Sequence, residues 1–261
     1  MSPVNVVVSA GNRVLPRGWA DFGRQLVIWF GFLGAYQVAR GIADRDPPRA
    51  FENGLHVIRI EKHANALFEL TLQRLVDGSN VLATAASWTY WNSEFTVLGI
   101  ALLWVYLRRN EAFTRFRNTI LLANVIGLVG YVLLPTAPPR MFPDFGFNDT
   151  LSSFGELNHG SGIIEFAANP YAAMPSLHAA DALIIGIVLF SVCRTPIAKA
   201  LWLLWPLWVW FSVMATGNHF WLDVVVGVVV ASISGVLVYR RPYARLGRLR
   251  PHWLRFRRAT A

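Results

Sequence analysis

The sequence predicts an all-α, polytopic membrane protein with six transmembrane helices plus an amphipathic interfacial helix, forming a single integral membrane domain over residues 1–261. Hydrophobic residues make up 54% of the chain and charged residues only 15%, against about 25% charged in soluble globular proteins. Apolar stretches recur, and a bilayer core about 30 Å thick requires about 20 apolar residues in each crossing helix. The single cysteine, Cys193, excludes disulfide frameworks and metal sites built from several thiolates.

The six expected spans are apolar runs that contain at most one acidic residue. They are Gln25 to Ala39, Trp88 to Leu107, Asn118 to Pro139, Pro175 to Cys193, Ala200 to Leu222 and Val224 to Tyr239. The first run would reach only about 22 Å as a helix, so it requires snorkelling flanks or local thinning of the bilayer. A secretory signal is the alternative for the first 40 residues, but no small-x-small cleavage site follows, so we expect a retained helix.

The segment from residue 41 to residue 77 is too polar to cross a membrane. Its leucines and isoleucines alternate with charged residues, a pattern typical of an interfacial or re-entrant amphipathic helix. Pro47 and Pro48 mark its start, because proline is tolerated in the first turn of a helix. We therefore expect one amphipathic helix on the membrane surface here.

The distribution of basic residues predicts the orientation. With six spans, 17 of the 24 lysines and arginines fall on the side that carries both termini, including a basic tail over residues 240–261. The positive-inside rule places that side in the cytoplasm. The net charge of +9 thus reflects topology and a tail that can contact anionic lipid headgroups, and it does not indicate nucleic-acid binding.

Three polar stretches are expected at the same, extracytoplasmic, ends of helices. They are Pro135 to Arg140, Met174 to His178 and Thr216 to Asp223. His219 and Asp223 are four residues apart, so on one helix face the carboxylate can hold the imidazole tautomer. Ionisable residues at membrane depth are costly, and their convergence on one face favours a catalytic site.

The second stretch also predicts an anion-binding helix start. Pro175 suits the first helical position, which leaves His178 in the first turn and Ser176 near free backbone N–H groups. Arg140 follows two prolines and offers a bidentate guanidinium to a phosphate. Each feature alone also fits a structural histidine or an interfacial anchor. Only the convergence of these residues on one face indicates a catalytic site.

These motifs resemble those of the membrane-bound type-2 phosphatidic acid phosphatase superfamily, and within it the inositolphosphotransferase branch that includes inositolphosphorylceramide synthases. The resemblance covers about residues 90–240. It is carried by Arg108-Arg109 with Arg115-Phe-Arg-Asn118, Leu134-Pro-Thr-Ala-Pro-Pro-Arg140, Ala173-Met-Pro-Ser-Leu-His178 and Ala215-Thr-Gly-Asn-His219-Phe-Trp-Leu-Asp223.

The resemblance implies a six-helix core and a His-His-Asp site that needs neither metal nor cofactor. It implies that His219 is the nucleophile on phosphorus, that Asp223 orients it and that His178 protonates the leaving oxygen. The expected phosphate-binding residues are Arg140, Ser176 and Asn218.

The sequence departs from the superfamily pattern at several positions. Arg140 stands without the usual leading lysine, Val213 follows Ser212 in place of arginine, and Leu177 occupies a position where phosphatases usually have glycine. These differences favour the inositolphosphotransferase branch. Ser93-Glu-Phe95 stands where that branch has a His-Phe-Pro-like stretch, which leaves the acceptor and lipid preference open.

The expected function is metal-independent phosphotransfer from a lipid phosphate or phospholipid to a hydroxyl acceptor or water, through a phosphohistidine, with a phosphoinositol-type headgroup as one candidate. Hydrolysis of a lipid phosphate or prenyl diphosphate is the alternative within the same class. The long outer loop from Arg140 to Met174 and segment 41–77 offer material for an acceptor pocket. A lipid or headgroup transporter would show repeats or broken helices, and an intramembrane serine protease would need a paired serine and histidine.

Three further polar residues of the expected spans have open interpretations. Glu94 is interpreted as a helix-end residue in the interface rather than a carboxylate at the edge of the site. Asp181 either tunes His178 or bonds to local polar groups. Asn124 is expected to make an interhelical hydrogen bond. The oligomeric state is left open.

Overall fold

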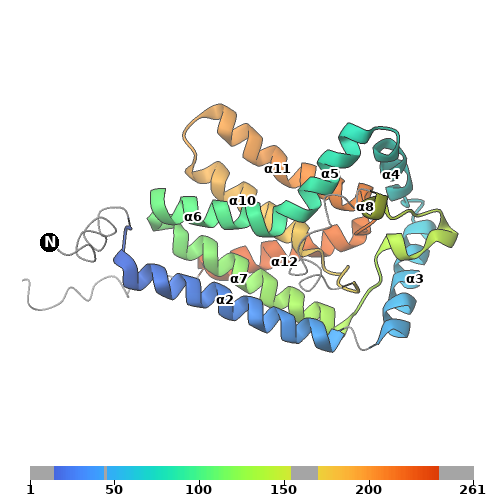
Figure 1. Ribbon diagram of the computed structural model, residues 1–261, viewed down its shortest axis with the longest axis horizontal. Coiled ribbons are helices and arrows are strands. Elements are labelled where there is room, and N and C mark those ends of the chain that lie inside the picture. The colour runs from blue at the N-terminus through green and yellow to red at the C-terminus, as the bar shows by residue number, and fades with distance from the viewer. Residues whose placement is uncertain (1–14, 44–45, 154–169, 241–261) are drawn as a thin grey trace, which may run out of the picture.

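The computed structural model describes residues 15–43, 46–153 and 170–240, and within them the regular elements are all helices (Figure 1). The long helices are α2 (Gly18–Ala43), α7 (Asn110–Leu133), α10 (Leu177–Val192), α11 (Pro196–Ala215) and α12 (Trp221–Arg240). The shorter ones are α3 (Pro47–His63), α4 (Glu69–Asp77), α5 (Asn80–Asn92), α6 (Leu98–Arg108) and α8 (Thr150–Ser153), with a π-helix η1 (Ser93–Val97) and 3₁₀ turns η2 (Pro139–Met141) and η3 (Pro143–Phe145).

The all-α membrane character is confirmed, and the predicted six spans are supported in part. By length and composition, α7, α11 and α12 are long and apolar enough to cross a membrane, and α10 is a shorter apolar helix. Helix α2 has 26 residues, where the sequence predicts a run of 15, because its polar flanks are also helical. Most of the predicted basic tail and of the outer loop, residues 241–261 and 154–169, lies outside the described residues.

Small residues let the central helices approach closely. A Cβ atom at Gly227 of α12 would collide with the carbonyl oxygen of Ser176, just before α10. A Cβ atom at Gly127 of α7 would collide with the side chain of Leu177. Such contacts are the usual means of helix association in membranes. They bring α7, α10 and α12 together around the start of α10, which carries one of the two predicted catalytic histidines.

The prediction of one amphipathic helix in segment 41–77 is wrong, because this segment forms two helices. Helix α3 starts at Pro47, as predicted, and ends at His63, where Asn65 adopts a left-handed conformation with φ of 50°. Asparagine tolerates that conformation and commonly ends a helix. The chain then passes through residues 64–68 into α4, and both helices lie near the loops at one end of the long helices (Figure 1).

The predicted span from Trp88 to Leu107 is not a continuous α-helix. It lies within the run α5, η1 and α6, where η1 is a π-helix over Ser93–Val97. A π-helical turn inside an α-helical run is uncommon and is found mostly at functional sites. Here the π-helix carries Glu94, which lies beside His178.

Candidate active site

The three polar stretches predicted at one depth meet in the structure and are joined by backbone hydrogen bonds. The amide of Ala173 donates to the carbonyl of Thr136, the amide of Arg140 donates to Gly217, and the amide of Ser176 donates to Asp223. Each stretch is thus bonded to at least one other, and together they form one loop cluster at the ends of α7, α10 and α12.

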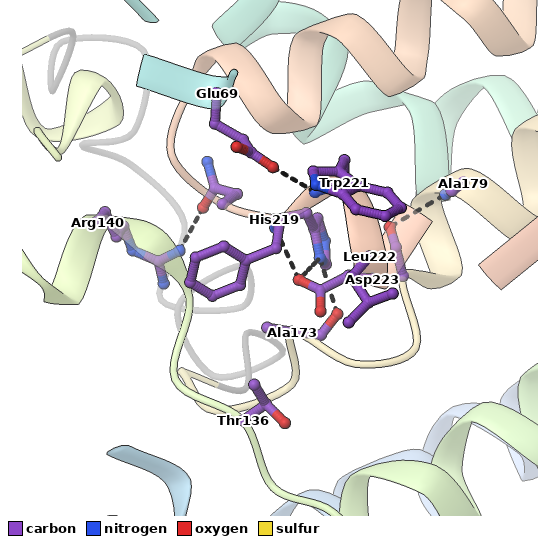
Figure 2. Close-up of polar contacts among 12 residues, drawn as sticks. Glu69, Thr136, Arg140, Ala173, Ala179, His219, Trp221, Leu222 and Asp223 are labelled. Atoms are coloured by element: carbon purple, nitrogen blue, oxygen red, sulfur yellow. Dashed lines mark hydrogen bonds and ion pairs between the residues drawn. The ribbon is translucent and has the colours of Figure 1, made fainter. Parts of the chain in front are cut away.

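His219 lies at the centre of this cluster, two residues before α12 (Figure 2). Its Nδ1 is 2.9 Å from the carbonyl oxygen of Ala173 and 3.5 Å from Oδ2 of Asp223. A carbonyl oxygen only accepts, so Nδ1 carries the proton and Nε2 keeps its lone pair. The predicted pairing of His219 with Asp223 is therefore present, although the histidine precedes the helix instead of starting it.

Burial and charge keep the His219 imidazole neutral. The side chain is 3% exposed, and burial lowers its pKa to about 3, with the positive charge of Arg140 lowering it further and the bond to Ala173 opposing the shift. A neutral imidazole with a protonated Nδ1 has a nucleophilic Nε2. The geometry thus equips His219 for nucleophilic attack at neutral pH.

His178 occupies the first turn of α10 and contacts a carboxylate from another element. Its ring stacks on Tyr90 with centroids 4.6 Å apart, and its Nε2 lies 3.3 Å from Oε2 of Glu94 and 3.2 Å from the carbonyl of Tyr90. The interpretation of Glu94 as an interfacial helix-end residue is wrong, because the π-helical turn directs its side chain to the histidine. The π-helix is the feature that distinguishes this carboxylate, and no pattern in the sequence predicts it.

The two histidine rings lie close to each other, with centroids 5.7 Å apart. Each histidine has its own carboxylate, Asp223 for His219 and Glu94 for His178. A buried histidine next to a carboxylate can hold a fixed tautomer and support an imidazolium charge. Two such pairs side by side are chemically able to act as a nucleophile and an acid-base group.

Arg140 and Asn218 form the polar side of the cluster. The guanidinium of Arg140 donates to Oδ1 of Asn218, and the Asn218 amide donates to Oγ1 of Thr216 at 2.8 Å. Gly217 between them has φ of 71°, and a Cβ atom there would lie 2.7 Å from the carbonyl of Asn148. Glycine is required at this position, because a side chain would strain this backbone conformation and would collide with the Asn148 carbonyl.

The predicted helix start at Pro175 is displaced by two residues. Helix α10 begins at Leu177, and Ser176 is its N-cap, with Oγ accepting from the amide of Ala179 at 3.3 Å. Serine side chains favour this role because they satisfy an otherwise free amide of the first turn. Ser176 is fully buried, and its hydroxyl oxygen already accepts a hydrogen bond from the Ala179 amide.

Two carboxylates that sequence reasoning missed hold the start of α12. Oε1 of Glu69 accepts from the amide of Trp221 at 2.6 Å, and Oε1 of Glu61 accepts from the amide of Leu222 at 3.2 Å (Figure 2). Both side chains are fully buried, and burial, together with the charge of Glu69, raises the pKa of Glu61 to about 9. The pKa of Glu69 is raised as well, by burial first.

Asp181 and Asn124 make a buried pair between α7 and α10. The Asn124 amide donates to both carboxylate oxygens of Asp181, at 2.9 and 3.1 Å. The expected interhelical bond of Asn124 is confirmed, and Asp181 bonds to a local polar group. Both residues, with Glu94, line one part of a cavity of about 420 Å³ whose remaining lining comes largely from apolar residues of α2 and α6.

Within the described part of the chain, no three histidine, cysteine, aspartate or glutamate side chains gather in a way that could hold a metal ion. The residues of the candidate site are two histidines, their carboxylates and one arginine. Comparison with known proteins finds a family match. A family profile described as the PAP2 superfamily matches residues 55–237, which is more than half of the chain.

The chain belongs to the PAP2 superfamily. Lipid phosphatases and phosphotransferases make up this superfamily, so the resemblance to type-2 phosphatidic acid phosphatases is confirmed. Phosphoinositol dihydroceramide synthase of Bacteroides thetaiotaomicron is 28% identical over 143 residues, which cover 49% of this PAP2 chain and 46% of that protein. The match therefore spans less than half of the length of that relative.

A solved structure is also similar to this PAP2 chain. LpxE from Aquifex aeolicus matches with a TM-score of 0.49 and 20% sequence identity. The match covers 65% of this chain and 93% of LpxE.

Proposed function

We propose that this PAP2 protein is a membrane phosphotransferase that transfers a phospho-group from a lipid to a hydroxyl acceptor through a phosphohistidine at His219. The observation that supports this most directly is the pair of histidines 5.7 Å apart, each with its own carboxylate. One of them has a free Nε2 and the other a carboxylate that can stabilise its imidazolium form. This division suits a two-step displacement on phosphorus.

In the first step, Nε2 of His219 attacks phosphorus and the P–O bond to the leaving group breaks. His178 gives its proton to the departing oxygen, and Glu94 stabilises the ring while it is charged. Arg140 and the amino end of α10 would stabilise the negative charge of the phosphoryl oxygens. Asn218 holds the guanidinium of Arg140 in place.

In the second step, an acceptor hydroxyl gives its proton to His178 and its oxygen attacks phosphorus. The P–N bond to His219 breaks, and the imidazole returns to its neutral form. A transferase must hold its acceptor in near-attack geometry, because water is abundant at the membrane face. With a phosphoinositol-type donor, the product would carry the headgroup on a lipid hydroxyl, as the name of the Bacteroides relative indicates for that protein.

The shape of the protein around Glu94 supports a lipid as substrate. The cavity of about 420 Å³ between α2, α6 and α7 is largely apolar, and Glu94 in its lining lies 3.3 Å from His178. A hydrocarbon chain in this cavity would lie in an apolar environment next to the acid-base histidine. A soluble phosphoester would have no use for such a space.

The proposed topology has six spans, with α2, the run α5 to α6, α7, α10, α11 and α12 crossing the membrane. Both termini would lie in the cytoplasm and the active site on the extracytoplasmic face. The arginine distribution supports this orientation.

The experiment that tests the proposed function uses purified protein in detergent with a panel of lipid phosphates and inositol phospholipids, with and without EDTA. We expect turnover that survives EDTA, a loss of about 10² to 10⁴ fold in His178→Ala and a larger loss in His219→Ala. A diacylglycerol, ceramide or polyol acceptor should divert the product from free phosphate to a transferred phospho-group. Normal activity in either variant removes the proposed site, and free phosphate or inositol phosphate as sole product at saturating acceptor favours hydrolysis.

A further inference from the structure

The start of α12 is held by carboxylates that come from outside the membrane helices. An α-helix begins with free backbone N–H groups that need acceptors. Asp223 accepts from the amide of Phe220 at 2.8 Å, and the next two amides go to Glu69 and Glu61. Only the first of these acceptors belongs to α12, and the other two come from α4 and α3.

We propose that Glu61 and Glu69 are positioning residues for His219, because they hold the backbone of Trp221 and Leu222 and thereby fix the turn that connects His219 to Asp223. His219 precedes this turn by two residues and Asp223 follows it directly. A displacement of the turn would separate Nδ1 of His219 from Oδ2 of Asp223, which lie 3.5 Å apart.

The burial of both carboxylates is difficult to explain by stability alone. A buried carboxyl group is costly and needs compensating bonds, yet Glu61 and Glu69 are fully buried, and the two carboxyl groups interact with each other. The Glu69 carboxyl group accepts from the amide of Trp221, and the Glu61 carboxyl group accepts from the amide of Leu222. The two buried carboxyl groups therefore stabilise the first turn of α12.

An aromatic contact also holds Trp221 in place. Phe68, which immediately precedes α4, stacks on Trp221 with centroids 6.3 Å apart and planes inclined by 20°. Glu69 thus contacts the backbone of Trp221, the first residue of α12, and Phe68 contacts its side chain. This explains why an amphipathic segment far from the catalytic motifs in sequence lies against them in the fold.

The two glutamates also interact electrostatically with Asp223. Glu61 is protonated at neutral pH, since its pKa is raised to about 9. The charged and titratable groups that act on the two glutamates are each other and Asp223. Replacing Glu61 by glutamine keeps a neutral group with an acceptor oxygen, whereas alanine at either position removes the bond to α12.

The test compares Glu69→Ala and Glu61→Ala with Glu69→Gln and Glu61→Gln, and with Glu52→Gln as the matched control. Glu52 is a glutamate of α3 whose side chain is 73% exposed and pairs with His56. Two readouts are measured on detergent-purified protein. One is the pH titration of His219 by NMR with ¹³C-labelled histidine, assigned with His219→Gln, and the other is kcat and KM on the lipid substrate.

We expect the alanine variants to raise the pKa of His219 from about 3 toward its ordinary 6.5, because the loosened turn admits water. We expect kcat to fall by about 10 to 100 fold with little change in KM, as for a misplaced catalytic group. Glu61→Gln should restore both values, and Glu52→Gln should leave them unchanged.

An unchanged His219 titration and an unchanged kcat in folded Glu69→Ala would overturn the proposal, and so would an effect of equal size in Glu52→Gln. The NMR arm does not depend on the proposed function for its readout. If the wild-type protein turns over no lipid phosphate, the proposed function fails while the titration still reports whether the two glutamates position His219.

Discussion

At the scale of single residues, the two catalytic candidates differ in what surrounds them. His219 is 3% exposed and bonded through Nδ1 to the carbonyl of Ala173, whereas His178 stacks on Tyr90 and contacts Glu94. The first environment excludes a positive charge on the ring, and the second has a carboxylate that accommodates one. This difference supports the proposed roles of His219 as nucleophile and His178 as acid-base group.

The environment of His219 predicts an unusual pH dependence. Attack requires the neutral ring, so the rate falls as pH drops through the pKa of His219, which burial lowers to about 3. We therefore expect kcat/KM to remain high at pH 5, with its acid limb well below the ordinary histidine value of about 6.5. A pH profile of the purified protein measures this, with apparent values assigned to the pair of histidines. An acid limb near 6.5 would show that His219 is exposed to water.

At the scale of elements, the motifs at helix ends could be predicted from sequence and their partners could not. The spacing of His219 and Asp223 and the order of the polar stretches are local, so they can be recognised without a structure. Glu69 and Glu61 bond to amides 152 and 161 residues away. On an amphipathic helix such glutamates look like solvated charges, and only the turn between α3 and α4 brings them to α12.

The protonated state of Glu61 makes a prediction about stability. Its pKa is raised in the folded protein to about 9 from an ordinary 4.5, so its contribution to stability is fully present below pH 4.5 and is lost as pH rises toward 9. Glu61→Gln removes this titration. We expect the thermal midpoint of the wild-type protein in detergent to fall from pH 5 to pH 9 relative to that of Glu61→Gln. Parallel curves would contradict a buried, protonated Glu61.

The cavity between α2 and α6 predicts a dependence on lipid chain length. Gly99 lines it, and a Cβ atom there would meet nothing within 4 Å, so Gly99→Leu should fill the space without disturbing the fold. We expect a higher KM for a long-chain lipid phosphate and an unchanged KM for a short-chain analogue. Gly235→Leu on α12 is the control, because that glycine is equally free of contacts and does not line the cavity. Equal effects of both variants on both substrates would argue against a chain in this cavity.

At the scale of the whole molecule, the hydrophobic pattern predicted the class of fold and most helix positions, but not every helix geometry. The π-helix η1 and the turn after His63 depend on packing and on single residues such as Asn65. The number of spans depends on how a membrane accommodates α2, which has polar residues near both of its ends. Among the residues that the structure describes, three helices are long and apolar enough to cross a membrane.

The orientation of the molecule can be tested by cysteine labelling. Replacing Cys193 by serine leaves the chain without cysteine, and single cysteines are then introduced at Asp144 and at Arg194, two exposed positions at opposite ends of the membrane helices. With intact cells, an impermeant maleimide should label Asp144→Cys and should reach Arg194→Cys only after lysis. The reverse pattern would contradict the charge-based topology.

If His219 carries the phospho-group between donor and acceptor, the phosphohistidine can be trapped. The protein is mixed with a lipid donor labelled at phosphorus in a single turnover, quenched in base, and the label on the chain is located by peptide mapping. We predict a labelled phosphoramidate on His219 that an acceptor hydroxyl discharges and that His219→Gln lacks. A wild-type enzyme that turns over without labelled protein, or a label that persists in His219→Gln, would contradict the account.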